Sequence, residues 1–208
     1  TNEIISYIKK ELTVKPITQN SIAETIPFPV YQESDKKIYV PRFWGLKIFG
    51  KPNQVKISQG KSINIEFKGQ LRKEPVNQEE IVDAYLNSLK TQESNYGSGG
   101  SCLIELKCGG GKTILALNIL SKLKKKTIIF VQKTFLKNQW IERIKEFLPD
   151  AKVGTIQGQI IDIEDKDIVI AMVQSISMKS YPESLFDDFG FTVIDETHHM
   201  ASNVFCNC

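Results

Sequence analysis

Cysteine is scarce in this sequence, and none occurs in the first hundred residues. The four cysteines stand at positions 102, 108, 206 and 208 of a 208-residue chain. A secreted domain stapled by disulfides would distribute its cysteines through the fold, and a chain of this size does not depend on such staples. We therefore expect an intracellular protein that works in a reducing compartment.

Long apolar runs are missing as well. No stretch approaches the roughly 18 consecutive apolar residues that a membrane-spanning helix needs, so we expect no membrane partner. The first residues lack a basic segment followed by an apolar one, which argues against a secretory signal. With 41% hydrophobic and 25% charged residues, the composition excludes collagen-like, coiled-coil and fully disordered classes.

The net charge of +3 is divided unevenly along the chain. Residues 1–74 contain 13 basic and 7 acidic side chains, whereas residues 75–208 contain 14 basic and 17 acidic ones. A basic first third is a weak indication of a polyanionic partner, because lysines spread over a solvated surface give the same balance.

The first 74 residues contain several prolines, short extended runs and little helical periodicity. Four apolar runs are candidates for strands, at 37–40, 44–49, 55–57 and 63–67. The last two alternate apolar with polar residues, as half-buried strands do, and the segment between them is suited to a hairpin connection. We predict a small, basic, β-rich module over residues 1–74, with a short helix at 2–12.

From residue 75 the pattern changes to alternating helices and apolar strands. Helical spacing predicts helices over 77–90, 112–124 and 134–148. Apolar runs predict strands over 102–106, 127–131, 153–156, 168–173 and 191–194, and the polar, glycine-rich residues 91–101 predict a surface loop. Continuous apolar strands separated by helices indicate an α/β fold with a parallel sheet covered on both faces.

A glycine turn lies between the predicted strand at 102–106 and the helix that follows. It contains Gly109, Gly110 and Gly111, followed by Lys112 and Thr113. Consecutive glycines let backbone amides converge on an anion, and the helix N-terminus behind them favours negative charge. Lys112 can reach terminal phosphates and Thr113 can offer a hydroxyl to Mg²⁺. The turn therefore predicts a P-loop, although the first glycine of the general pattern is replaced by leucine at position 106.

Two adjacent carboxylates, Asp195 and Glu196, follow the last predicted strand. A magnesium nucleotide site needs one carboxylate to hold the metal and a second group to orient or deprotonate the attacking water. Such a pair alone is more often a solvated strand end. Two or three strand–helix–strand crossovers fit between Lys112 and Asp195, so the two motifs together favour a nucleotide-binding site.

These motifs jointly resemble those of superfamily 2 helicases and translocases. Residues 109–113 resemble motif I of that family, in which the leading glycine of the P-loop is commonly absent, and residues 195–198 resemble motif II in its DExH form. Residues 130–140 resemble motif Ia, and residues 170–176 resemble a later motif on the DNA-strand side. The similarity extends over roughly residues 38–205 and is greatest to the XPB-like branch, particularly the helicases of large DNA viruses.

The resemblance implies a fold, cofactors, partners and residue roles. Residues 75–208 would form a RecA-like domain that binds ATP and Mg²⁺, with DNA or RNA as the track and a viral factory or virion as the location. Lys112 and Thr113 would bind phosphate and Mg²⁺, while Asp195 would hold the metal and Glu196 activate water. His198 would couple the site to the rest of the motor. Leu71, Arg72 and Gln78 fit the element that recognises adenine in this family, with a slightly longer insertion between Arg72 and Gln78.

Two parts of such a motor are not found in the 208 residues. Motif III does not follow motif II, and the second RecA-like domain, which carries an arginine finger, is absent. Loss of such an arginine reduces phosphoryl transfer on the order of 10³–10⁵-fold. We therefore expect a partial helicase, its first RecA-like domain ending after motif II, that binds nucleotide and hydrolyses it poorly by itself.

Other interpretations stay open from the sequence. The helicase-like motifs also fit an ATP-gated binding module that changes shape without moving a strand, and a P-loop kinase is a weaker third choice. A zinc site formed by His198, His199, Cys206 and Cys208 is disfavoured, because the cysteine spacing lacks a matched second pair. The aromatic residues at 43, 44 and 49 could stack on bases, but they are better explained as the core of the first module.

Overall fold

The computed structural model describes residues 2–15, 26–96 and 99–197. The chain divides into two compact units, one of Thr1–Val55 with Gln92–Gly99 and one of Lys56–Thr91 with Gly100–Cys208. Residues 56–74 therefore belong with the second unit, so the first is shorter than the predicted module of residues 1–74.

The first unit combines two helices with two small hairpins. Helix α1 spans Asn2–Glu11 and α2 spans Arg42–Phe49. The hairpins pair β1 (Thr13–Val14) with β2 (Phe28–Pro29), and β3 (Gln32–Ser34) with β4 (Lys37–Tyr39), all antiparallel. The predictions of a helix at 2–12 and a strand near 37–40 are confirmed, whereas the extended run predicted at 44–49 is wrong.

Residues 44–49 form a helix because helical spacing brings their apolar side chains onto the rest of the unit. Leu46 is buried. Trp44 stacks on Tyr7 of α1 with ring centroids 6.3 Å apart and meets Phe49 edge-on at 5.9 Å. Gly50 ends the helix with a positive φ of 76°. These contacts favour the interpretation of Trp44 as a core residue over a base-stacking platform.

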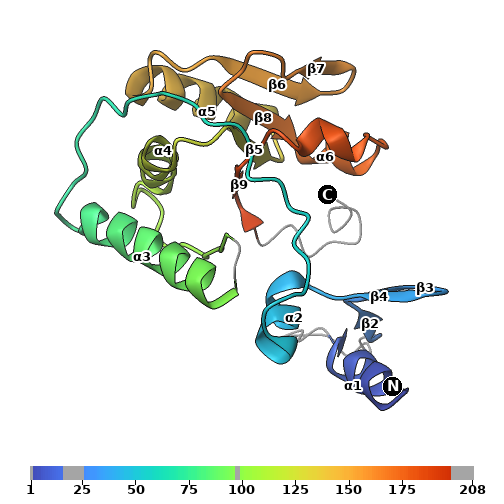
Figure 1. Ribbon diagram of the computed structural model, residues 1–208. Helices are drawn as coiled ribbons and strands as arrows, with labels where there is room; N and C mark the ends of the chain where they lie inside the picture. The colour runs from blue at the N-terminus through green and yellow to red at the C-terminus, as the bar shows by residue number, and fades with distance from the viewer. Residues whose placement is uncertain (1, 16–25, 97–98, 198–208) are drawn as a thin grey trace. The chain divides into compact units, whose positions relative to one another are not determined.

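The second unit is built on a five-stranded sheet with the order β7-β6-β8-β5-β9 (Figure 1). The four strands other than β7 are parallel, and β7 pairs antiparallel with β6 at the edge. The strands are β5 (Thr127–Val131), β6 (Val153–Gln157), β7 (Ile160–Asp162), β8 (Ile168–Met172) and β9 (Phe191–Ile194). The prediction of a parallel sheet is confirmed.

Helices and a short turn cover the two faces of this sheet. The helices are α3 (Gln78–Tyr96), α4 (Lys112–Leu123), α5 (Thr134–Phe147) and α6 (Val173–Ser177). On one face, α4 and α5 pack on alternate residues of β5 and β8, such as Ile129 and Ile170. On the other face, the alternate residues, including Ile128 and Val169, pack against α6 and the 3₁₀ turn Glu183–Phe186. The central strands β5 and β8 are apolar except for the buried Thr127 because both faces are covered.

Three predicted segments differ from the structure. Helix α3 continues to Tyr96, through part of the loop predicted at 91–101. Residues 102–106 form no strand, since no backbone ladder includes them. Residues 55–57 and 63–67 form no hairpin; the latter are an extended segment whose alternate residues pack on the α4–α5 core, including the buried Ile65. The alternation of apolar and polar residues at 63–67 thus reflects burial of one side of an extended segment that pairs with no neighbouring strand among the described residues.

Candidate nucleotide-binding site

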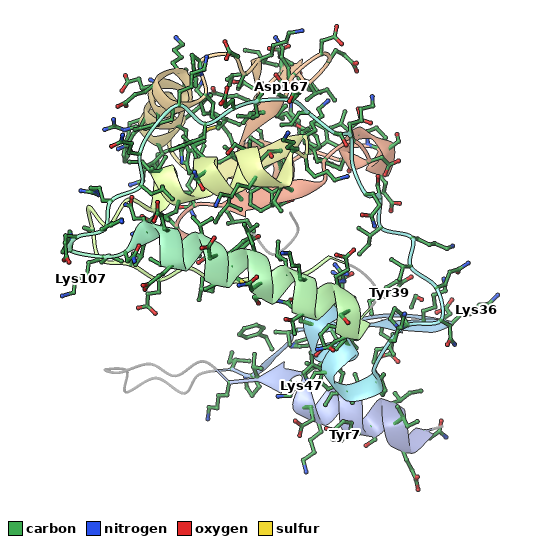
Figure 2. All side chains as sticks on the ribbon, turned by 60° about the vertical axis from the view of Figure 1, so that its left-hand side comes forward. Tyr7, Lys36, Tyr39, Lys47, Lys107 and Asp167 are labelled. Carbon is green, nitrogen blue, oxygen red and sulfur yellow. The ribbon has the colours of Figure 1, made fainter. Side chains whose placement is uncertain are left out.

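The glycine turn adopts a backbone suited to binding an anion. Gly109 and Gly111 have positive φ angles of 75° and 86°, which favour glycine. The N–H of Gly110 donates to the carbonyl of Lys107 at 3.0 Å and closes the turn. Figure 2 shows Lys107 at the outer end of this turn, with its side chain directed away from the protein body.

Helix α4 begins directly after this turn with its first N–H groups uncapped by a side chain. Gly111 is the N-cap residue and no side chain caps the helix. The free N–H groups and the helix dipole together favour a phosphate at this end. Lys112 is in the first turn, where its Nζ donates to the carbonyl of Leu106 at 3.1 Å. Thr113 is the next residue of the same turn, so both predicted phosphate-loop side chains stand at this helix end.

Gln78, the first residue of α3, is buried against the glycine turn and hydrogen-bonds to its backbone. Its side chain is 1% exposed. Its Oε1 accepts from the backbone N–H of Arg72 at 2.8 Å, and its Nε2 donates to the carbonyl of Gly110 at 3.1 Å. Arg72 in turn donates from Nη2 to the carbonyl of Gly109 at 3.1 Å. The structure therefore links residues 72 and 78 to the glycine turn, and the adenine contact of Gln78 stays a prediction.

The predicted carboxylates follow the last residue of β9. The N–H of Asp195 donates to the carbonyl of Phe130 at 3.1 Å, which continues the pairing of β9 with β5. The Oδ2 of Asp195 accepts a hydrogen bond from the indole Nε1 of Trp140 at 2.9 Å. Glu196 has a φ of 55°, a left-handed conformation that costs a residue other than glycine on the order of 1 kcal/mol and that occurs preferentially at functional sites.

Lys112 of the glycine motif and the two carboxylate residues line one cavity of about 660 Å³ in the second unit, whereas Gly109, Gly110, Gly111 and Thr113 are not among its lining residues. Its lining includes Lys112, Asp195 and Glu196, although these residues are far apart in the sequence. Residues 101–106, strand β9 and Trp140 form much of the remaining wall. Burial raises the pKa of Tyr85, which also lines the cavity, to about 12. This phenol is therefore neutral at pH 7.

The donor set of the site fits a magnesium nucleotide. The hydroxyl of Thr113 and the carboxylate of Asp195 are oxygen ligands, and Mg²⁺ in nucleotide sites uses one or two carboxylates together with substrate phosphates. Within residues 2–15, 26–96 and 99–197, no group of three or more His, Cys, Asp or Glu side chains could hold a metal. His198 and the other members of the disfavoured zinc set lie outside the described residues.

Sequence reasoning identifies the two motifs and misses two contacts that support them. The hydrogen bond from Trp140 to Asp195 joins residues of different elements, and no local sequence pattern predicts it. The contact of Arg72 with the glycine turn is not predicted by the sequence either, although the family resemblance singles out Leu71 and Arg72 as part of the element expected to recognise adenine. Among the described residues, no helix is long and apolar enough to cross a membrane.

The chain is similar to named helicases from viruses and yeast. It is 34% identical, over 98% of its length, to a provisionally named ATP-dependent RNA helicase of Acanthamoeba polyphaga mimivirus. It is 30% identical, over 66% of its length, to a provisionally named helicase of Invertebrate iridescent virus 6. A provisionally named ATP-dependent helicase of Saccharomyces cerevisiae is 28% identical over 61% of the chain. The chain spans only 38%, 30% and 19% of these three relatives.

The fold is similar to that of a solved ATPase core. The SWI2/SNF2 ATPase core of Sulfolobus solfataricus, solved in complex with dsDNA, matches with a TM-score of 0.52 and 21% identity, over 73% of this chain and 31% of that one. This likeness confirms the predicted RecA-like α/β fold. Residues 72–207 match the family described as "Type III restriction enzyme, res subunit". The chain therefore belongs to this family and contains the nucleotide-binding N-terminal part of a superfamily 2 helicase.

Proposed function

We propose that this chain binds ATP with Mg²⁺ in the cavity between the glycine turn and β9, as the first half of a motor that moves on DNA or RNA. One observation carries the proposal: Lys112 and the carboxylates of Asp195 and Glu196 line the same cavity. A solvated strand end or an incidental glycine turn would not bring these three side chains together.

Each site residue then has a role that follows from its position. Gly109, Gly110 and Gly111 surround the phosphates with backbone N–H groups, and Lys112 exchanges the carbonyl of Leu106 for a phosphate oxygen. Thr113 and Asp195 hold Mg²⁺, which when bound offsets the charge that develops on the transferred phosphoryl group. Glu196 orients or deprotonates the attacking water.

Two further roles complete the proposed site. Gln78 recognises adenine, which requires its amide to exchange at least part of its bonding to Arg72 and Gly110. His198, outside the described residues, couples the site to the second RecA-like domain, the partner that supplies the missing arginine.

The carboxyl ends of β5 and β8 support a nucleic acid track. The Nζ atom of the exposed Lys133 lies 5.9 Å from the ring centre of Phe135, a residue that is 63% exposed. Gln174 donates to the carbonyl of Gln132. A cation and an exposed ring are groups that phosphates and bases can engage. The names of the relatives and the duplex in the solved ATPase core are compatible with RNA and DNA respectively.

The location proposed for the protein is an intracellular, reducing compartment, with a viral factory or a virion as the specific sites. Cys102 and Cys108 are exposed thiols that form no disulfide among the described residues, which suits an environment where thiols stay reduced. The similarity to viral helicases is the reason for naming these two sites.

ATP hydrolysis by the 208 residues, and by the longest available form of the protein, tests the proposal. Each is assayed alone and with single-stranded DNA, RNA or duplex. We expect the 208 residues to bind ATP and turn it over slowly, and the longer form to be stimulated by one of these nucleic acids. ATP binding without stimulation of the longer form would favour the alternative, a catalytically weak ATP-gated module. Robust stimulated turnover by the 208 residues would refute the expected need for a second domain.

A further inference from the structure

We propose that Trp140 is a positioning residue for ATP hydrolysis, because its indole N–H fixes the orientation of the Asp195 carboxylate. This inference rests on the proposed function of the cavity, in which Asp195 holds Mg²⁺. Trp140 itself lies on α5, and it contacts Asp195 across the fold at 2.9 Å between Nε1 and Oδ2.

The donor is held rigidly by its own surroundings. Trp140 is 3% exposed and belongs to the core cluster in which α5 packs on the sheet, with Ile144 on the next turn of the helix and Ile129 on β5. A side chain fixed by packing gives its hydrogen bond a defined direction at little further entropic cost. The indole N–H therefore comes to the carboxylate from a fixed point.

The acceptor is fixed at its backbone as well. The N–H of Asp195 donates to the carbonyl of Phe130 on the neighbouring strand at 3.1 Å. With the main chain tied to β5 and Oδ2 engaged by the indole, the remaining torsional freedom of the side chain is small. The Oδ1 atom is then left for the metal or for a water molecule bound to it. A ligand oriented before the metal arrives is what a well-formed metal site requires.

Packing alone does not explain this pairing. A buried indole N–H needs some acceptor, and a backbone carbonyl would satisfy it without affecting the active site. Here the acceptor is the carboxylate of the predicted metal ligand, and the indole lines the same cavity as Lys112. Hydrogen bonds to a charged acceptor are stronger than neutral ones. The expected effect of losing the N–H is therefore on metal affinity more than on folding.

The Trp140→Phe variant tests the proposal, with Trp44→Phe as the matched control in the first unit. Phenylalanine keeps an aromatic ring in the core and removes only the donor. Binding of a fluorescent ATP analogue to the 208 residues is measured against Mg²⁺ concentration and also without metal. We expect Trp140→Phe to raise the half-saturating Mg²⁺ concentration about 10- to 100-fold, to leave metal-free nucleotide binding unchanged, and to fold with a normal circular dichroism spectrum. Trp44→Phe should leave all three unchanged.

A second measurement applies if Trp140→Phe does not fold. The ¹⁵N-labelled protein gives two indole N–H signals, and Trp44→Phe assigns them. We expect Asp195→Asn to shift the Trp140 signal, because a neutral acceptor replaces a charged one, and to leave the Trp44 signal in place. An unmoved Trp140 signal, or a folded Trp140→Phe variant with normal Mg²⁺ dependence, would refute the positioning role. Absence of any ATP binding by the unaltered chain would instead refute the proposed function.

Discussion

Replacement of Gly111 by alanine is expected to destabilise the second unit by about 2–5 kcal/mol, more than the same change at Gly109. Both glycines have a positive φ, and adopting this conformation costs alanine about 1–2 kcal/mol. The two positions differ in their surroundings. A Cβ at Gly111 would stand 2.3 Å from the Nε2 of Gln78, whereas no described residue other than its chain neighbours has an atom within 4 Å of a Cβ at Gly109.

The additional loss at Gly111 comes from displacement of the Gln78 amide. This buried amide makes two hydrogen bonds, to the N–H of Arg72 and the carbonyl of Gly110. Each contributes about 0.5–1.5 kcal/mol net, so moving the side chain adds about 1–3 kcal/mol to the backbone cost. Gly109→Ala should lower the free energy of unfolding only by the cost of the positive φ angle, about 1–2 kcal/mol.

Urea unfolding of both variants provides the assay. With Trp44 replaced by phenylalanine in every protein, fluorescence reports on Trp140 and hence on the second unit. A double-mutant cycle of Gly111→Ala with Gln78→Ala should show that the two losses of unfolding free energy are not additive. Once the Gln78 side chain is truncated to alanine, the Cβ at position 111 has nothing to clash with there. Equal losses at Gly109 and Gly111, or additive losses in the cycle, would refute the clash as the cause.

Three further outcomes are expected. Glu196→Gln should lower ATP turnover of the longest available form at least about 100-fold, as for loss of a general base, while equilibrium binding of ATP stays within twofold of the unaltered protein; undiminished turnover would exclude a catalytic role. Hydrogen bonding to Lys61 lowers the pKa of Asp188, so the stabilisation it provides is present above its unfolded-state pKa of about 3.9 and lost as the pH falls through the lower folded-state value. Asp188→Asn should therefore lose less stability than the unaltered chain on acid titration followed by circular dichroism, and parallel curves would contradict this. Trp44→Ala should destabilise the first unit by about 3 kcal/mol, since it removes the ring that contacts both Tyr7 of α1 and Phe49, and limited proteolysis of residues 1–55 would detect the loss.

The sequence is most informative where a segment is buried on both sides or fixed by special backbone geometry. Strand β5 is predicted with the bounds that the structure has, because a threonine followed by four consecutive apolar residues between helices is typical of a strand covered on both faces. The start of α4 at Lys112 follows from the glycine turn before it. Both signals are local, and therefore a single sequence contains them.

Errors arise where the outcome depends on a distant partner. The run 44–49 fits either a strand or a helix, and its contact with Tyr7 favours the helix. The alternation at 63–67 correctly predicts which side is buried, while the hydrogen-bonding partner of a strand cannot be inferred from it. At the site, the proximity of Lys112 and Asp195 is predicted only because the two motifs occur together in nucleotide-binding proteins. The hydrogen bond from Trp140 to Asp195 depends on the angle at which α5 crosses the sheet, which no residue pattern specifies.

The order of strands in the sheet has a consequence for how the chain acquires its structure. Strand β5 pairs with β8 and β9 on its two sides, so Thr127 meets Ile168 and Phe191, both much later in the sequence. Parallel pairings between distant segments form slowly, because the closure of a long loop precedes the contacts that stabilise it. During synthesis β5 therefore emerges before both of its neighbours. Asp195 and Glu196 join Lys112 around their shared cavity only when β9 pairs with β5, which makes this cavity one of the last features to assemble.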